Sequence, residues 1–271
     1  MDQEMKNLFS VEGKIALVTG GSRGIGEMIA AGFLSHSAKV YISSRKAAVC
    51  DATAKRLSDR YGKECLSLPA GLGGLNGITS LVSALSEREN RLDILVNNAG
   101  ASWGAPLEEF PEIGWDKVMN TNVKAIFFLT QKLLPLLQKS ASPENPARVI
   151  NIGSIDGIKT PSFNNFSYSP SKAAVHHLTR VLAAHLIKDH IIVNAIAPGP
   201  FPTWMLSTGV GFGGKTEGEG VNWDLVGQSN PSGRVGTMED IAGLTIFLSS
   251  RAGAYVVGQT IPCDRGMVAV S

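Results

Sequence analysis

The feature that most constrains the fold of this chain is a regular alternation of short, β-branched apolar segments with longer amphipathic ones. Residues 14–19 (KIALVT), 39–43 (KVYIS) and 148–152 (RVINI) have the composition of buried strands, and a segment with helical spacing follows each. This alternation is typical of βαβ units, in which parallel strands form one sheet with helices on both faces. We therefore predict an α/β fold of the Rossmann type, a doubly wound parallel sheet of about seven strands.

The individual elements can be placed from the same pattern. Pro135 is expected to bend or end its helix, because proline lacks the N–H that a helix interior uses. No linker or repeat interrupts the 271 residues, so a single domain over residues 1–271 is predicted. The expected strands are 14–19, 39–43, 64–68, 93–96, 148–152, 191–195 and 259–262, and the expected helices are 24–36, 46–60, 75–89, 115–139, 168–188 and 238–249.

Residues 200–234 break this rhythm, because they are rich in glycine and proline and include GVGFGGKTEGEG at 209–220. A long irregular segment in a compact domain is usually a functional loop or a disordered one. We interpret it as a loop that covers the substrate, with a passive surface insertion as the alternative. Four aromatic residues support the first interpretation, namely Phe201, Trp204, Phe212 and Trp223.

Charge and composition argue against several classes of function. A net charge of +2 without a basic cluster does not suit nucleic acid or an acidic membrane surface. No apolar run approaches the roughly 20 residues that span a bilayer, and the N-terminus lacks the apolar core of a signal peptide. Cys50, Cys65 and Cys263 are far apart and odd in number, which favours reduced thiols over disulfides or a metal site. We expect a cytoplasmic protein with no metal, nucleic-acid or membrane partner.

A glycine-rich turn, TGGSRGIG at residues 19–26, directly follows the first expected strand and opens the first helix. Glycines allow the backbone to approach a pyrophosphate closely, and a helix N-terminus offers free N–H groups and a favourable dipole. Strand, glycines and helix occur in the order that a dinucleotide site requires. The turn is therefore predicted to bind a dinucleotide rather than to be an ordinary turn.

The end of the second strand indicates which dinucleotide binds. An NAD site has an acidic residue there to hold the ribose hydroxyls, whereas this chain has Ser44, Arg45 and Lys46. Arg45 is suited to a 2′-phosphate, with Ser44 and Arg23 as neighbours. The sequence therefore predicts NADP(H), and the alternative is a solvated helix start with incidental basic residues.

Three polar residues in the second half of the chain form a candidate catalytic set. Ser154 follows the fifth strand, and Tyr168 and Lys172 are four residues apart at the start of a helix, which places them on one face. A nearby ammonium group favours a phenolate, so Lys172 is expected to lower the pKa of Tyr168. A Tyr-x-x-x-Lys pair alone occurs by chance in many helices, but the combination with Ser154 and the glycine turn argues for catalysis.

Together these motifs resemble the short-chain dehydrogenase/reductase family, in the family's order and over nearly the whole chain. Within the family, the glycine turn, the NPARVINIGS stretch and Arg45 are similar to those of bacterial and fungal β-ketoacyl reductases, including the rhamnolipid-pathway type. The matching segments are TGGSRGIG at 19–26, NNAG at 97–100, Asn122 in MNTNV, Ser154, YSPSK at 168–172 and PGPFPTWM at 198–205.

The resemblance implies a role for each catalytic residue. Tyr168 is the general acid for the carbonyl oxygen, and Ser154 hydrogen-bonds that oxygen. Lys172 binds the nicotinamide ribose and tunes Tyr168, while Asn122 holds a water that links Lys172 to solvent. Cofactor contacts are implied for Gly20, Ser22, Arg23, Ile25, Ser44, Arg45, Leu72, Asn98, Ala99, Gly100, Tyr168, Lys172, Pro198, Gly199, Phe201 and Thr203.

The chain departs from the family pattern at a few positions. Gly71 stands where many members have an aspartate that contacts the adenine, and Arg265 stands where the family usually has a glycine near an oligomer interface. Asn145 and Asp189 stand where carrier-protein reductases have basic residues beside the active site. A carrier-protein substrate is therefore less expected than a small-molecule carbonyl.

The expected function is NADPH-dependent reduction of a β-keto or hydrophobic secondary-metabolite carbonyl to a secondary alcohol. Three alternatives stay open: an alcohol dehydrogenase that works in the oxidative direction, a non-catalytic NADP-binding regulatory protein, and a non-redox role in biosynthesis. The complete catalytic set argues against the last two. The residues expected around the substrate are Ser102, Trp103, Ile155, Asp156, Phe163, Asn164, Phe166 and Phe201.

The expected oligomer is a homotetramer, or a homodimer, because helices 115–139 and 168–188 resemble those that pair family members. His176 and His177 lie on the second of these helices, past the catalytic turn. They are expected to be interface or surface residues, since nothing near them has metal-ligand spacing.

Overall fold

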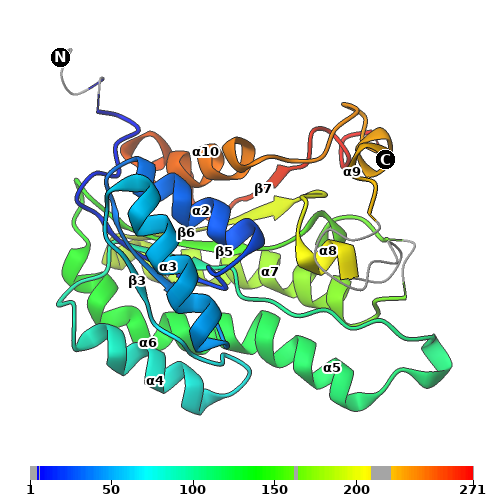
Figure 1. Cartoon of the computed structure of the whole chain (residues 1–271). Coiled ribbons are helices and arrows are strands. Elements are labelled where there is room, and N and C mark those ends of the chain that lie inside the picture. The colour runs from blue at the N-terminus through cyan, green and yellow to red at the C-terminus, as the bar shows by residue number, and fades with distance from the viewer. Residues whose placement is uncertain (1–4, 6, 162–163, 209–220, 271) are drawn as a thin grey trace.

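The computed structural model describes residues 5, 7–161, 164–208 and 221–270. One sheet of seven strands runs through the molecule in the order β3-β2-β1-β4-β5-β6-β7, and every neighbouring pair is parallel (Figure 1). The predicted fold class is therefore confirmed. The strands are β1 (Ile15–Thr19), β2 (Lys39–Ser43), β3 (Cys65–Ser67), β4 (Ile94–Asn97), β5 (Ala147–Ile152), β6 (Ile191–Pro198) and β7 (Thr260–Cys263).

Helices cover both faces of the sheet. Helices α2, α3 and α10 cover one face of the sheet, and α4, α6 and α7 cover the other (Figure 1). The buried side chains of each set form a separate core. Along β1, Ala16 and Val18 point into the first core and Ile15 and Leu17 into the second, because successive strand residues face opposite sides. The main helices are α2 (Gly24–Ser35), α3 (Ala47–Tyr61), α4 (Leu75–Ser86), α5 (Glu112–Met119), α6 (Ala125–Ser140), α7 (Tyr168–Leu186) and α10 (Met238–Ser249).

The expected helix 115–139 is the main correction to the predicted elements. It is divided into α5, a π-helical turn at Asn120–Lys124, and α6. Pro135 does not end α6, which continues to Ser140. Both Pro135 and Gln131 are exposed, so water can reach the Gln131 carbonyl that lacks a helical N–H partner.

The expected substrate loop contains two short helices in the residues that the structure describes, α8 (Trp204–Thr208) and α9 (Trp223–Gln228). The side chain of Asn222 accepts a hydrogen bond from the Leu225 N–H (3.0 Å) and so caps α9. Residues 209–220, with Phe212, lie outside the described part, as does Phe163.

The parallel sheet brings the predicted motifs to one edge. Strands β1, β4, β5 and β6 all end at the carboxyl edge, and the glycine turn, the NNAG segment, Ser154 and the PGPFPTWM segment follow these four strands. The strand order reverses between β1 and β4, and a crevice at such a reversal is where open α/β sheets bind their ligands. Among the helices that the structure describes, none is long and apolar enough to span a membrane.

Candidate active site

The glycine turn between β1 and α2 has the backbone that a phosphate group requires. Gly20 and Gly24 have φ values of +64° and +57°, in the left-handed region that favours glycine. A Cβ at Gly26 would collide with the Gly20 carbonyl and the Asn98 amide. Arg23, the N-cap of α2, provides no side-chain cap, so the first N–H groups of this helix are left for a ligand.

The end of β4 is tied to this turn. The Thr19 hydroxyl accepts hydrogen bonds from the N–H groups of Asn98 and Ala99, both at 3.0 Å. In return, the Asn98 side chain donates to the Thr19 carbonyl at 2.9 Å. The predicted neighbours of the cofactor on β1 and β4 thus form one rigid corner.

Ser44 and Arg45 directly follow β2. They place a hydroxyl group that lacks a hydrogen-bond partner next to a cationic side chain. Within the described residues, the buried Ser44 Oγ has no hydrogen-bond partner. Arg45 is exposed. A Cβ at position 71 would lie 3.9 Å from the Arg45 Cγ, whereas Gly71 leaves the aliphatic part of the Arg45 side chain without this contact. A buried hydroxyl without a partner beside an arginine fits an anionic group at this corner. Leu72, by contrast, is buried in the core on the α4 side.

The structure brings Ser154, Tyr168 and Lys172 together. Ser154 is 8 % exposed, and its side chain lies near enough to the Tyr168 phenol to oppose the rise in the pKa of that group. Lys172 is 5 % exposed, and its Nζ lies 5.5 Å from the centre of the Tyr168 ring. The same ammonium donates to the Ile152 carbonyl at 2.8 Å, which fixes it beneath the tyrosine.

Asn122 lies in the π-helical turn, is 1 % exposed and joins this group through its side chain. Its Oδ1 accepts from the Ala101 N–H at 2.8 Å, and its Nδ2 donates to the Ala101 carbonyl (3.0 Å) and to the Ser171 hydroxyl (2.9 Å). A Cβ at Gly100 would lie 3.4 Å from Asn122 Oδ1 and 3.9 Å from Lys172 Nζ. Asn122 and Lys172 therefore both lie beside Gly100, and Lys172 connects this corner to Tyr168.

Ser171 is a residue that sequence reasoning missed. It is fully buried, accepts from Asn122 and donates to the Tyr168 carbonyl at 2.6 Å. The signal was its spacing in the YSPSK motif, because Ser171 is three residues after Tyr168 and so lies on the same helix face.

The expectation that Lys172 lowers the pKa of Tyr168 is wrong for this structure. Burial raises the pKa of the Tyr168 phenol well above its usual value, and the nearby Asp156 carboxylate raises it further, against the opposing effect of the Ser154 hydrogen bond. Burial also lowers the pKa of Lys172 to about 8, with Asp156 acting in the opposite direction. Tyr168 is consequently protonated at neutral pH and available as a proton donor.

His176 and His177 were both expected to be surface or interface residues. His177 is exposed, as expected. The expectation is wrong for His176, which is 7 % exposed within this single chain. The imidazole of His176 packs beneath Gly153 and Gly157, the two glycines on either side of Ser154. Its Nε2 has no hydrogen-bond partner among the described residues, and burial lowers the pKa of the ring to about 4.

The aromatic residues expected around the substrate are only partly where they were predicted. Trp103 packs against α5, where a Cβ at Gly114 would lie 2.6 Å from its ring. Phe110 and Phe166 make an edge-to-face contact with ring centres 5.9 Å apart. The Phe201 ring is 2 % exposed and belongs to the core on the α2 side, so it does not form part of an open aromatic wall.

The segment after β6 is held by the C-terminal strand. The Gly199 N–H donates to the Cys263 carbonyl at 3.0 Å, and a Cβ at Gly199 would lie 2.9 Å from the Cβ of Asp264. Arg265 has a φ of +53°, the conformation that favours the glycine usual in the family, and its Nε donates to Ser232 at 3.2 Å. This contact ties the C-terminal segment to the base of the predicted substrate loop.

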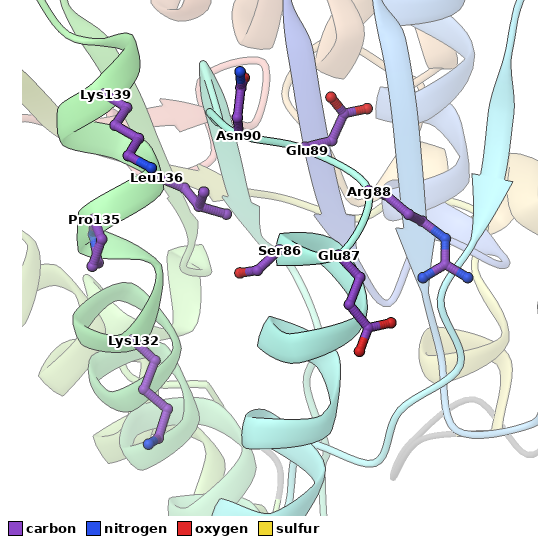
Figure 2. A pocket seen from close by; sticks show the side chains of 9 residues that line it. All are labelled: Ser86, Glu87, Arg88, Glu89, Asn90, Lys132, Pro135, Leu136 and Lys139. Atoms are coloured by element: carbon purple, nitrogen blue, oxygen red, sulfur yellow. The ribbon is translucent and has the colours of Figure 1, made fainter.

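A separate surface pocket of about 660 Å³ lies away from these residues, at the opposite edge of the sheet (Figure 2). Side chains of α6 and of the C-terminal end of α4 line it, close to where the chain enters β4. Its members include none of the predicted catalytic or cofactor residues; they are Ser86, Glu87, Arg88, Glu89, Asn90, Lys132, Pro135, Leu136 and Lys139. In the described part of the chain, no cluster of three or more histidine, cysteine or acidic side chains could hold a metal.

Comparison with known proteins supports the family resemblance that the sequence motifs indicate. A family model described as enoyl-(acyl carrier protein) reductase matches residues 20–268. The rhamnolipids biosynthesis 3-oxoacyl-[acyl-carrier-protein] reductase of Pseudomonas aeruginosa is 51% identical over 262 residues, which cover 97% of this chain and 99% of that protein. Gluconate 5-dehydrogenase of Gluconobacter oxydans is 33% identical over 262 residues, 96% of this chain and 97% of that protein.

Solved structures give the same result at the level of the fold. The Pseudomonas aeruginosa RhlG/NADP active-site complex superposes with a TM-score of 0.87 at 50% identity, covering 96% of this chain and 98% of that one. The order of the motifs, the strand order and these matches lead to one conclusion: the chain belongs to the short-chain dehydrogenase/reductase family.

Proposed function

We propose that this protein is an NADPH-dependent ketoreductase that reduces an uncharged ketone, a β-keto compound or a hydrophobic secondary-metabolite carbonyl, to a secondary alcohol. The observation that carries the proposal is the position of the Lys172 ammonium, which lies 5.5 Å from the centre of the Tyr168 ring and donates to the Ile152 carbonyl, with Ser154 beside the same phenol. This group lies at the same sheet edge as the glycine turn.

The residues present fit NADP(H). The glycine turn and the uncapped N-terminus of α2 would hold the pyrophosphate, and Arg45 with the unpartnered Ser44 hydroxyl would hold the 2′-phosphate. The complex of the similar Pseudomonas aeruginosa protein contains NADP, which supports the same choice here. When bound, the nicotinamide supplies a hydride to the carbonyl carbon.

The catalytic residues of this chain would supply position and a proton. Ser154 and Tyr168 would both hydrogen-bond the carbonyl oxygen, and Tyr168 would transfer its proton as negative charge develops there. Because burial and Asp156 hold the pKa of Tyr168 high, the residue starts as the acid that reduction needs. Lys172 would hold the nicotinamide ribose and, with Asn122, return a proton to Tyr168.

Asp156 supports an uncharged substrate. Its backbone N–H bonds to Ser154, and its carboxylate acts electrostatically on both Tyr168 and Lys172. A carboxylate so close to the carbonyl site repels an acid substrate, such as the gluconates acted on by the less similar Gluconobacter relative. The proposal therefore favours β-keto esters, thioesters and apolar ketones.

The proposal includes a homotetramer, with a homodimer as the alternative, and a cytoplasmic location. Apolar side chains on the predicted pairing helices are partly exposed in the single chain, namely Trp115, Phe127 and Val181. Light scattering that reports a monomer would contradict the oligomer. All three cysteines carry free thiols, which supports a reducing compartment.

The first experiment is a panel of ketones with NADPH or NADH, followed by loss of the absorbance of the reduced nicotinamide. We expect turnover of uncharged β-keto esters and bulky ketones with NADPH and little with NADH. Tyr168→Phe should nearly abolish turnover while NADPH still binds. Equal use of NADH would contradict the role of Arg45. Substantial activity of Tyr168→Phe would contradict the mechanism. Binding of NADPH without turnover of any ketone or secondary alcohol would favour the regulatory alternative.

A further inference from the structure

The glycine turn and the predicted substrate loop meet at a stacked pair of side chains. The guanidinium carbon of Arg23 lies 4.2 Å from the centre of the Trp204 ring. Arg23 is the N-cap of α2, and Trp204 is the first residue of α8. This distance is well within the range of a cation–π contact, so the two segments are joined by an attractive interaction.

A second contact beside the stack fixes its geometry. A Cβ at Gly24 would lie 3.1 Å from the Thr203 side chain, which shows that α8 begins directly against the glycine turn. Thr203 in turn holds the first turn of α8, because its carbonyl accepts from the N–H groups of Leu206 (3.1 Å) and Ser207 (2.9 Å). Trp204 is therefore presented to Arg23 from a fixed backbone.

Stacking leaves the hydrogen-bonding edge of Arg23 free. A guanidinium that stacks on an aromatic ring uses its flat face, while its five N–H donors lie in the plane and point outward. Arg23 makes no ion pair in the described part of the chain. A long exposed arginine loses much rotational entropy when it binds a phosphate, and an aromatic ring that already holds it lowers that loss.

We propose that Trp204 is a positioning residue for cofactor recognition, which holds Arg23 so that its N–H edge meets the 2′-phosphate of NADP(H). The inference rests on the proposed function. It adds a residue of the predicted substrate loop to the determinants of NADPH over NADH. If Trp204 has this role, the position of α8 and the binding of the phosphate are coupled.

The test compares direct binding of NADPH and NADH, by calorimetric titration, to the full chain and to three variants. Trp204→Leu removes the aromatic face and keeps an apolar side chain, Trp204→Phe keeps an aromatic face, and Tyr255→Leu is a control at an exposed aromatic residue. We expect Trp204→Leu to weaken NADPH binding roughly five- to tenfold, the usual size of a cation–π contact, with NADH binding unchanged. Trp204→Phe should recover most of the loss, and Tyr255→Leu should bind like the wild type.

A double-mutant cycle with Arg23→Ala separates this role from general packing. In the Arg23→Ala background, Trp204→Leu should have little further effect on NADPH binding. Additive losses, equal losses for NADPH and NADH, or no loss in Trp204→Leu would each overturn the inference. A wild-type protein that binds neither nucleotide would instead overturn the proposed function, and this inference with it.

Discussion

The backbone N–H of Asp156 donates a hydrogen bond to the Oγ of Ser154 across 3.1 Å, which places an acidic residue beside the proposed catalytic group. The short 3-10 helix that carries it, Ile155–Gly157, lies against the start of α7, where a Cβ at Gly157 would be 2.6 Å from the backbone of Lys172. In the described residues the Asp156 carboxylate makes no hydrogen bond or ion pair, and burial raises its pKa. The carboxylate therefore acts on its neighbours through its charge.

Replacing Asp156 by asparagine should move the pH profile of reduction. The carboxylate disfavours the Tyr168 phenolate and favours the Lys172 ammonium, so its removal lowers the pKa of both groups. Reduction needs a protonated Tyr168, so the alkaline limb of kcat/KM should move to lower pH in Asp156→Asn. Oxidation of the alcohol needs the phenolate, so its acidic limb should move in the same direction.

The control for this profile is Asp51→Asn, on the exposed side of α3, which should leave both limbs in place. The same Asp156→Asn variant should accept a β-keto acid relative to its uncharged ester better than the wild type does. Unshifted limbs together with an unchanged acid-to-ester preference would show that Asp156 is only a structural residue.

Ser171→Ala should change the orientation of the Asn122 side chain while the side chain itself stays in place. Loss of the hydroxyl leaves one buried N–H of the Asn122 amide without a partner, since the other donates to the Ala101 carbonyl. An unsatisfied buried donor costs about 1–3 kcal/mol, so the free energy of unfolding should fall by that amount. The rate should fall as well, because the amide can then rotate.

Denaturant unfolding and kcat are the measurements, with Ser169→Ala as the matched control. The Ser169 hydroxyl makes a longer bond of 3.3 Å to Asn165 and is only partly buried, so its loss should cost less than about 1 kcal/mol. If Ser171→Ala were as mild as Ser169→Ala in both measurements, Ser171 would have no part in holding Asn122.

The predicted strands agree with the observed ones to within a few residues. The reason is clearest for the central strands β1, β4, β5 and β6, in which every residue is buried. The positions of the glycine turn and of Tyr168 and Lys172 could also be predicted, because local spacing determines them. The π-helical turn at Asn122 could not be predicted, because a helical pattern over 115–139 does not show which residue is inserted into the turn.

Properties that depend on tertiary contacts were also beyond sequence reasoning. The pKa of Tyr168 is raised because of burial, which the spacing of Tyr168 and Lys172 does not reveal. The stack of Arg23 on Trp204 joins segments that are far apart in the chain, and neither residue belongs to a pattern that signals the other. His176 follows Lys172 at helical spacing, but a histidine at such a position is equally compatible with a surface.

The N-terminus of α10 should lose stability in acid. Asp240 receives two hydrogen bonds from Arg234, at 2.6 and 2.9 Å, and one from the Thr237 N–H at 2.8 Å. These contacts, the Arg234 guanidinium first, hold the pKa of Asp240 well below its usual range. The stabilisation is therefore fully present above the unfolded-state pKa of about 3.9 and is lost as the pH falls toward the folded-state value.

Asp240→Asn should lower the free energy of unfolding by about 2 kcal/mol at neutral pH, since it removes charge-assisted bonds and part of a capping box. The difference from the wild type should shrink below about pH 4. Asp59→Asn, in an exposed pair with Lys55, should cost no more than about 0.5 kcal/mol and serves as the control. Equal effects of the two substitutions at neutral pH would contradict the prediction.

Gly153→Ala should distort the backbone next to Ser154, because a methyl group there would collide with the His176 imidazole and lie 3.3 Å from the Ile196 carbonyl. Overpacking of this kind costs about 1–3 kcal/mol, and the next residue is Ser154, so kcat should fall together with stability. His176→Ala opens the space beneath Gly153, and the double variant should be more stable than the sum of the two single effects by about 1 kcal/mol. Recovery should be incomplete, because the Ile196 carbonyl remains.

The matched control is Gly243→Ala in α10, where a Cβ meets nothing within 4 Å and should stabilise the helix slightly. Strict additivity of Gly153→Ala and His176→Ala would show that the glycine is required for a reason other than the buried histidine.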